Sequence, residues 1–210
     1  MRKRILTVLI ACIMALGAAQ AEDLRTLFIN MPDTIMPVLT KSERMDFLDY
    51  LDSGMKARVR NKLGGESEMT ELSDRSLTVS TSQSGRIEMV LFPRKKGVNL
   101  ICIIKTVTAR YDDSRLAFYD ENWMPIDVAG LIELPQFDDY LTKEALASDS
   151  LEVLKKQSML RLQSVSSTDN GLEFRYTSLD YIGQDADKFR SWFKTEPVRY
   201  VWNGKRFKRK

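Results

Sequence analysis

Apolar and polar residues alternate through much of the first half of the chain, as they do in antiparallel strands with one buried face. Residues 76–80 begin this alternation, and residues 86–91 continue it after a turn at residues 83–85. Residues 98–108 are apolar on both parities, which predicts a central strand covered on both faces. Residues 116–119 follow as a short fourth strand. The pattern therefore predicts a β meander.

An amphipathic helix is predicted ahead of this meander. Thr40 is followed three residues later by Glu43, which is the capping-box sequence that begins many helices. Apolar residues recur behind it at helical spacing, and they are Phe47, Leu48, Leu51 and Met55. We therefore predict a helix over residues 41–53. Residues 56–75 are polar and contain two adjacent glycines, so we interpret them as a loop.

The pattern changes after Pro125 and then repeats in outline. Residues 126–136 lack periodicity, and residues 137–157 have a helix-like composition that divides near residues 147–149. Four further elements are predicted, and they are strands around residues 160–162 and 172–176, a short helix over 185–194 and a hairpin over 198–208. Asn203-Gly204 favours the type I′ turn of such a hairpin.

Both parts of the chain thus place helices before antiparallel strands. We predict an α+β fold in which helices pack on an antiparallel sheet. Residues 22–210 would form a single domain, or two similar halves over 22–125 and 126–210. The second arrangement would be similar to the β-lactamase-inhibitor-protein fold, although no residue-level repeat accompanies it.

The first residues have the pattern of a secretory signal. A basic stretch at residues 2–4 precedes an apolar run over residues 5–16, and Ala19-Gln20-Ala21 supplies the small residues that a signal peptidase reads. The apolar run is shorter than the about 20 residues that cross a bilayer. We therefore interpret residues 1–21 as a cleavable signal peptide.

A lipoprotein box is the alternative interpretation of the same segment. Leu9-Ile10-Ala11 precedes Cys12, which would then be lipidated and become the new N-terminus. Both interpretations predict an exported protein, in the periplasm or on the outer surface of a Gram-negative bacterium. Contact with a membrane is predicted only through a lipid at Cys12 or through the basic C-terminus.

Charge and residue usage exclude several classes of protein. The 32 Lys and Arg residues include three in the leader, so residues 22–210 contain 29 basic and 29 acidic residues. A neutral chain has no overall attraction to nucleic acid. The chain contains no histidine, which excludes Ser-His-Asp and Cys-His catalysis. Cys102 lies in an apolar run and is interpreted as a buried small residue. No spacing fits a metal or cofactor site.

Several short strings resemble an exported family of Bacteroidales-type bacteria that is catalogued only as a domain of unknown function. They are Met31-Pro32-Asp33, Arg44 with Asp46, Leu51-Asp52, Asn61 with Gly64, and Asp113-Ser114 before Phe118-Tyr119-Asp120 and Trp123. The closing Trp202-Asn203-Gly204-Lys205 is similar to terminal hairpins of exported proteins in such bacteria. The resemblance implies a location in the Gram-negative envelope and supplies no activity or cofactor.

Three sets of residues are candidates for a site. Aromatic side chains would form a stacking platform for a sugar or a peptide, and they are Trp123, Trp192, Tyr200, Trp202 and Phe207. A basic C-terminus would bind an anionic partner, through Lys205, Arg206, Lys208, Arg209 and Lys210. Acidic pairs would serve carboxylate catalysis, although turns and helix starts also need such residues, and the pairs are Asp112-Asp113, Asp120-Glu121 and Asp138-Asp139.

These observations predict a non-enzymatic module that binds an envelope protein, a peptide or a glycan. Two alternatives stay open. One is a glycan-acting enzyme that uses carboxylates alone, and the other is an envelope protein that contacts lipid or polymer through its basic C-terminus.

Overall fold

The structure is a computed structural model that describes residues 23–95, 97–158 and 160–210. The predicted signal peptide and Cys12 lie outside the described residues. No helix among the described residues is long and apolar enough to cross a membrane.

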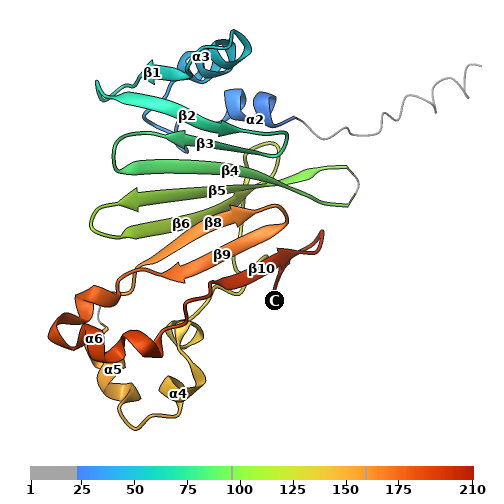
Figure 1. Ribbon diagram of the computed structural model, residues 1–210. Helices are drawn as coiled ribbons and strands as arrows, with labels where there is room; N and C mark the ends of the chain where they lie inside the picture. The colour runs from blue at the N-terminus through green and yellow to red at the C-terminus, as the bar shows by residue number, and fades with distance from the viewer. Residues whose placement is uncertain (1–22, 96, 159) are drawn as a thin grey trace, which may run out of the picture.

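A seven-stranded antiparallel meander forms the centre of the molecule (Figure 1). Its strands follow one another in chain order, and they are β1 (Arg58–Arg60), β2 (Glu66–Leu72), β3 (Ser76–Ser80), β4 (Gly85–Pro93), β5 (Asn99–Thr108), β6 (Asp112–Tyr119) and β7 (Pro125–Ile126). The predicted meander over β3 to β6 is confirmed, with β6 longer than the sequence indicated.

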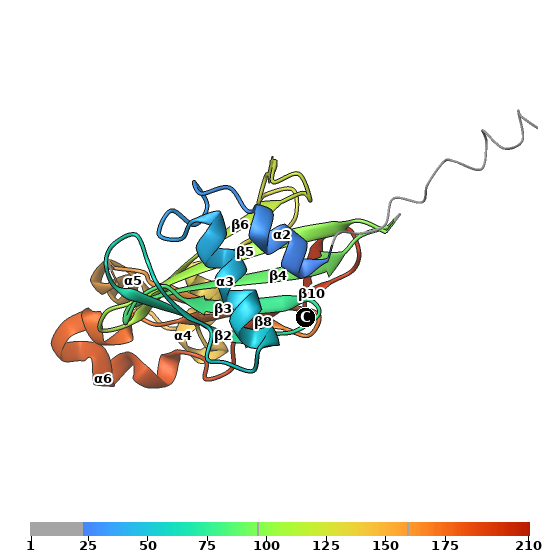
Figure 2. The ribbon, with the colours of Figure 1, turned by 90° about the horizontal axis from the view of Figure 1, so that it is seen from above.

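Two helices cover one face of this sheet (Figure 2). They are α2 (Leu24–Asn30) and α3 (Lys41–Asp52). The predicted capping box is present in α3, where Thr40 Oγ1 accepts from Glu43 N–H and the Glu43 carboxylate accepts from Thr40 N–H. Apolar side chains from alternate positions of β3, β4 and β5 meet these helices, and Met89, Ile101 and Ile103 are almost completely buried there.

A second, four-stranded antiparallel sheet covers the opposite face. Its strand order is β11-β10-β9-β8, and the bounds are β8 (Gln163–Thr168), β9 (Gly171–Tyr176), β10 (Val198–Trp202) and β11 (Phe207–Arg209). The side chains of β4 and β5 that point away from α2 and α3 pack against this second sheet. Phe92, Cys102 and Ile104 therefore share a cluster with Phe174 and Trp202. The two parts of the chain thus share one core, and β5 is covered on both faces as its apolar run predicted.

Short helices gather in a lobe beside the second sheet, at the bottom of Figure 1. They are η1 (Phe137–Tyr140), α4 (Lys143–Leu146), α5 (Leu151–Gln157), η2 (Leu179–Asp185), α6 (Ala186–Phe189) and η3 (Arg190–Trp192). The lobe has its own small core, centred on Leu141, Leu154 and Phe189. The α+β class is therefore confirmed, and the likeness to the β-lactamase-inhibitor-protein fold stays a prediction.

Three expectations about individual segments were wrong. Residues 56–75 contain β1 and β2, whose buried positions include the polar Ser67, so the usual apolar alternation is weak. The expected single helix over 185–194 is instead the short helix α6, which lies between the 3-10 helices η2 and η3. The strand expected around residues 160–162 begins only at Gln163, and Val165 is its one fully buried apolar residue.

Candidate functional site

The C-terminal hairpin brings most of the predicted site residues together. The Asn203 side chain accepts from the backbone N–H groups of Lys205 and Arg206, and Gly204 adopts the positive φ that this turn requires. Trp202 pairs with Phe207 and Tyr200 pairs with Arg209 across β10 and β11. Because side chains alternate between the two faces of a strand, the aromatic rings share the inner face.

The inner face of the hairpin is part of the core. Tyr200, Trp202 and Phe207 are each 4% exposed and pack against Phe92 and its neighbours. The Trp202 indole N–H donates to the Pro93 carbonyl oxygen at 2.7 Å. The Tyr200 hydroxyl donates to the Glu133 carbonyl oxygen at 2.6 Å, and burial raises its pKa. These rings therefore stabilise the fold and leave only their edges for a ligand.

The other two predicted aromatic residues lie elsewhere. Trp123 packs with Tyr119 in the cluster under α2 and α3, on the opposite face of the large sheet. Trp192 packs edge-on against Phe189 in the helical lobe. The five aromatic residues are thus divided among three clusters and do not form one surface.

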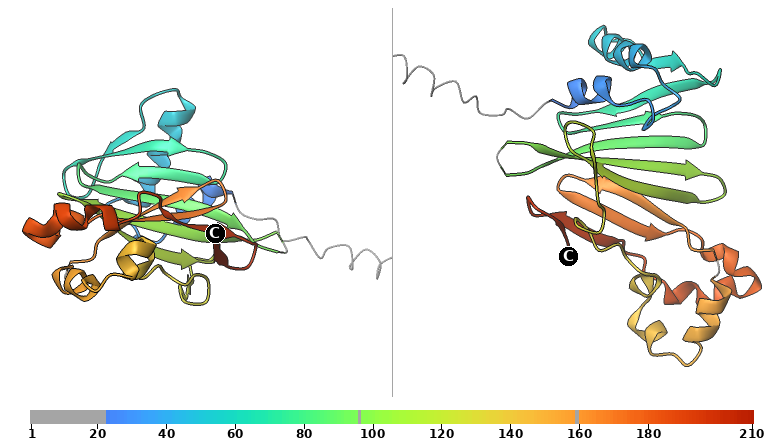
Figure 3. Two further views of the ribbon diagram at one scale, coloured as in Figure 1. Left: turned by 60° about the horizontal axis from the view of Figure 1, so that its bottom comes forward. Right: turned by 180° about the vertical axis from the view of Figure 1, so that it is seen from behind.

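A groove of about 620 Å³ lies between β11 and the segment over residues 129–139. This segment runs from β7 past the C-terminal strand to the helical lobe, as Figure 3 shows in the view from behind. The lining of the groove combines apolar, acidic and basic residues, and includes Leu131, Ile132, Glu133, Leu134, Asp139, Tyr200, Arg206, Phe207, Lys208 and Arg209. The volume is within the range of about 300–1,000 Å³ that holds small ligands or peptide fragments.

Direct contacts join the two walls of the groove at two places. At one end, Phe207 N–H donates to the Leu131 carbonyl oxygen at 2.8 Å. At the other end, the Arg209 guanidinium donates to the Asp139 carboxylate, and Lys194 Nζ donates to the Asp139 carbonyl oxygen at 2.8 Å. Among the described residues, no backbone hydrogen bond joins the segment over 132–136 to β11.

Some charged side chains at the groove have a partner and others do not. Burial alone would raise the pKa of Asp139, but hydrogen bonds from Arg209 and from Gln136 N–H outweigh it and hold this pKa below its ordinary value. Asp139 is therefore ionised at neutral pH and engaged with Arg209. The side chains of Arg206 and Lys208 are exposed and have no hydrogen bond or ion pair among the described residues. The groove therefore has two uncompensated cations.

Two smaller hollows continue this basic surface. One of about 290 Å³ adjoins the groove at Arg209, and one of about 360 Å³ adjoins it at Arg206. Eight basic residues line the three hollows, and they are Arg94, Lys194, Arg199, Lys205, Arg206, Lys208, Arg209 and Lys210. Four acidic residues accompany them, and they are Asp127, Glu133, Asp139 and Glu196. The predicted basic C-terminus thus forms the rim of a concave surface.

The acidic pairs singled out in the sequence mainly make local contacts. Asp120 accepts from the N–H groups of Asn122 and Met124 in the turn before β7. Asp138 pairs with Lys155, while its neighbour Asp139 belongs to the groove. No group of three side chains suited to a metal ion occurs among the described residues.

Comparison with known proteins identifies the family. The sequence model of the family described as "Protein of unknown function (DUF3256)" matches residues 16–207. The chain belongs to this family. No curated protein matches the chain. Among solved structures, a domain of an uncharacterized protein from Porphyromonas gingivalis W83 is similar with a TM-score of 0.78 and 22% identity, over 90% of this chain and 98% of that one. The resemblance to a Bacteroidales-type family of unknown function is thereby confirmed.

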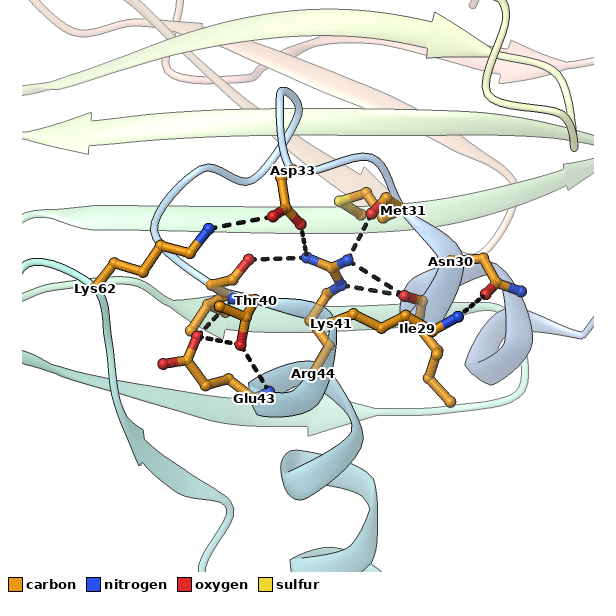
Figure 4. A network of polar contacts seen from close by, with 10 residues as sticks. Ile29, Asn30, Met31, Asp33, Thr40, Lys41, Glu43, Arg44 and Lys62 are labelled. Carbon is orange, nitrogen blue, oxygen red and sulfur yellow. Dashed lines mark hydrogen bonds and ion pairs between the residues drawn. The ribbon is translucent and has the colours of Figure 1, made fainter.

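Strings that carried this resemblance build polar networks in the DUF3256 fold. Arg44, which is 1% exposed, donates to the carbonyl oxygens of Ile29, Met31 and Leu39 and to the Asp33 carboxylate (Figure 4). Lys62 also donates to Asp33 and, with Arg44, holds the pKa of Asp33 below its ordinary value. The network therefore fixes the entry segment between α2 and α3.

Asn61 plays a similar part in the turn between β1 and β2 of this DUF3256 protein. Its amide nitrogen donates to Ser67 Oγ and to the Thr81 carbonyl oxygen, and its amide oxygen accepts from the N–H groups of Leu63 and Gly65. Every hydrogen-bonding position of this buried side chain is thus used, which makes it a structural residue.

Sequence reasoning missed the segment over residues 129–139, which supplies half of the groove. Its pattern is irregular, so only its place between two predicted elements was visible. The sequence singled out the pair Asp138-Asp139 in this segment, but an exposed carboxylate can be solvated without a basic partner, so the pair did not indicate a distant one. In the structure, the distant partner of Asp139 is Arg209.

Proposed function

We propose that this protein is a non-enzymatic binding module of the bacterial envelope, and that the groove beside β11 holds an anionic ligand. One observation carries the proposal: the side chains of Arg206 and Lys208 have no hydrogen bond or ion pair among the described residues, and both residues line a groove with an apolar floor. Cations beside low-dielectric walls attract anions more strongly than cations surrounded by water.

The shape of the groove favours an extended ligand. Leu131, Ile132 and Phe207 are buried beside it, so apolar contact would accompany charge pairing. The adjoining hollows at Arg206 and Arg209 lengthen the surface in both directions. A ligand with several spaced negative charges uses more of this surface than a single small anion does.

The chemistry of the groove favours binding over carboxylate catalysis. Glu133 and Asp139 both line it, and an enzyme of this kind needs one carboxyl group that carries a proton near neutral pH. Asp139 has a lowered pKa, so it does not supply that proton, and its carboxylate is engaged by Arg209 and Gln136 N–H, which disfavours it as the second, ionised group as well. The exported location is also part of this proposal, and the signal-like sequence of residues 1–21 supports it. Fractionation of cells, together with the intact mass of the recovered protein, tests it.

Binding of three anionic probes tests the site. The probes are polyglutamate, inorganic polyphosphate and vesicles of phosphatidylglycerol, each measured against the purified protein at low and high salt. We expect at least one to bind, with an affinity that falls as salt rises. The variant Arg206→Glu/Lys208→Glu is expected to lose this binding.

A matched control reverses two other exposed cations. Arg60 on β1 and Arg115 on β6 are exposed, and their side chains have no hydrogen bond or ion pair among the described residues. Arg60→Glu/Arg115→Glu changes the net charge equally and should retain binding. The proposal fails if no probe binds, or if both double variants weaken binding to the same extent.

A further inference from the structure

The outer edge of β11 carries main-chain groups that point into the groove. Phe207 N–H donates away from β10, to Leu131. Main-chain groups alternate in direction along an antiparallel strand, so the Phe207 carbonyl and the Arg209 N–H and carbonyl point the same way. Among the described residues, no backbone hydrogen bond joins the segment over 132–136 to the Phe207 carbonyl or to Arg209. The second sheet thus ends in an open edge.

We propose that an extended acidic peptide segment binds in the groove by adding a strand to this edge. The inference rests on the proposed function, because it specifies the class of ligand for the same site. A peptide alternates donors and acceptors along its backbone, as the edge of β11 does. A phosphate group offers acceptors only and leaves the carbonyls of Phe207 and Arg209 unpaired.

The charge pattern of the sheet indicates acidic side chains in the partner. On its outer face, Arg199 of β10 pairs with Glu173 of β9 directly across the strands at 2.8 Å. Lys208 of β11 lies opposite Val201 and lacks such an acid. A strand added beside β11 would place a side chain next to Lys208, where a carboxylate continues the pattern.

The same charges argue against a second copy of this chain as the occupant. Antiparallel pairing of two β11 edges would bring Arg206, Lys208 and Lys210 of one copy against the same cations of the other. Like charges across a strand pair are destabilising, and lysines on an edge strand are a common protection against self-pairing.

A designed peptide and its backbone-methylated forms test the inference. The probe is a blocked peptide in which Glu alternates with Val and Thr, and binding is measured by fluorescence anisotropy. N-methylation of every second residue removes one set of N–H donors, and methylation of the other residues removes the second set. A strand bonded through one edge uses only one set. We therefore expect one methylated peptide to lose binding and the other to retain it.

Two substitutions at one position separate the backbone from the side chain. Arg209→Ala removes the guanidinium and keeps the N–H, whereas Arg209→Pro removes both. Proline is tolerated on an edge strand when its nitrogen faces outward. We expect Arg209→Pro to bind the peptide about tenfold more weakly than Arg209→Ala, because a main-chain hydrogen bond is lost. Thermal unfolding of both variants shows whether each is folded.

The outcomes distinguish this inference from the proposed function. Equal binding of both methylated peptides, or equal binding by Arg209→Ala and Arg209→Pro, overturns strand addition. If polyphosphate or phosphatidylglycerol vesicles bind through Arg206 and Lys208 while the acidic peptide does not, the inference fails and the proposed function stands. If no anionic probe binds in a way that depends on these residues, both fail.

Discussion

Several single residues in this protein serve mainly to satisfy the hydrogen bonds of backbone groups. Arg44, Asn61 and Asp120 each join several backbone groups that lie outside regular helices and strands. A buried backbone group without a partner costs about 1–3 kcal/mol. Such residues therefore hold irregular segments in place, and their replacement is felt in stability.

Replacement of Arg44 by Met tests this at the most buried of these residues. Arg44→Met keeps much of the side-chain volume and leaves the carbonyls of Ile29, Met31 and Leu39 without their donor. We expect the free energy of unfolding to fall by about 3 kcal/mol or more in urea titrations. Asp33→Asn is the control, since Asp33 is half exposed and its loss should lower the free energy of unfolding much less than the loss of Arg44 does. Equal effects of the two substitutions would contradict this account.

Two buried tryptophans differ in one hydrogen bond. Trp202 donates to the Pro93 carbonyl oxygen, whereas the Trp123 indole N–H is buried without a partner among the described residues. Trp202→Phe loses a hydrogen bond and packing, while Trp123→Phe loses packing alone. We expect Trp202→Phe to be more destabilising by about 1 kcal/mol in chemical denaturation. A larger cost for Trp123→Phe would show that its N–H has a partner in solution.

At the scale of elements, the strands that were predicted correctly are those with strong apolar signals. β5 is apolar at both odd and even positions because the helices cover one of its faces and the second sheet covers the other. Its sequence pattern therefore indicates a central strand. β2 was missed because its buried face includes Ser67, which Asn61 satisfies from outside the strand. Local pattern cannot reveal a strand whose buried polar group is satisfied by a distant residue.

The turn that begins β9 provides a test of element packing. A Cβ atom on Gly171 would clash with the Tyr200 carbonyl oxygen, so Gly171→Ala would force β9 away from β10. We expect a loss of about 2–3 kcal/mol, measured by thermal and urea unfolding. Gly204→Ala is the comparison, because Gly204 has open space and a positive φ, and should cost about 1 kcal/mol. If Gly171→Ala were the milder change, close contact between β9 and β10 would be disproved.

The candidate site was half predictable for a related reason. The basic C-terminus and the hairpin at Asn203-Gly204 follow from local sequence, and both are present. The opposite wall of the groove comes from residues 129–139, which lie there through the Arg209–Asp139 pair and the contact between Leu131 and Phe207. Contacts between segments about 70 residues apart in sequence leave no periodic signal.

At the scale of the whole molecule, the large sheet has two covered faces, and each cover comes from a different part of the chain. Helices α2 and α3 precede the meander, and the second sheet follows it. The second sheet covers a face of β4 to β6 whose buried apolar residues are Val90, Phe92, Leu100, Cys102, Ile104 and Phe118. Removing it would expose a contiguous apolar surface, which soluble monomers rarely tolerate.

Separate production of residues 22–125 tests whether the first part of the chain folds alone. This fragment contains β1 to β6 of the meander but lacks the second sheet, and residues of both parts contribute to one cluster. We therefore expect it to self-associate, to bind the dye ANS and to show no cooperative thermal transition. The full protein under the same conditions should be monomeric with a single transition, since unfolding either sheet uncovers the core of the other. A monomeric fragment that unfolds cooperatively would establish two independent halves, and the shared cluster would then be an interface between domains.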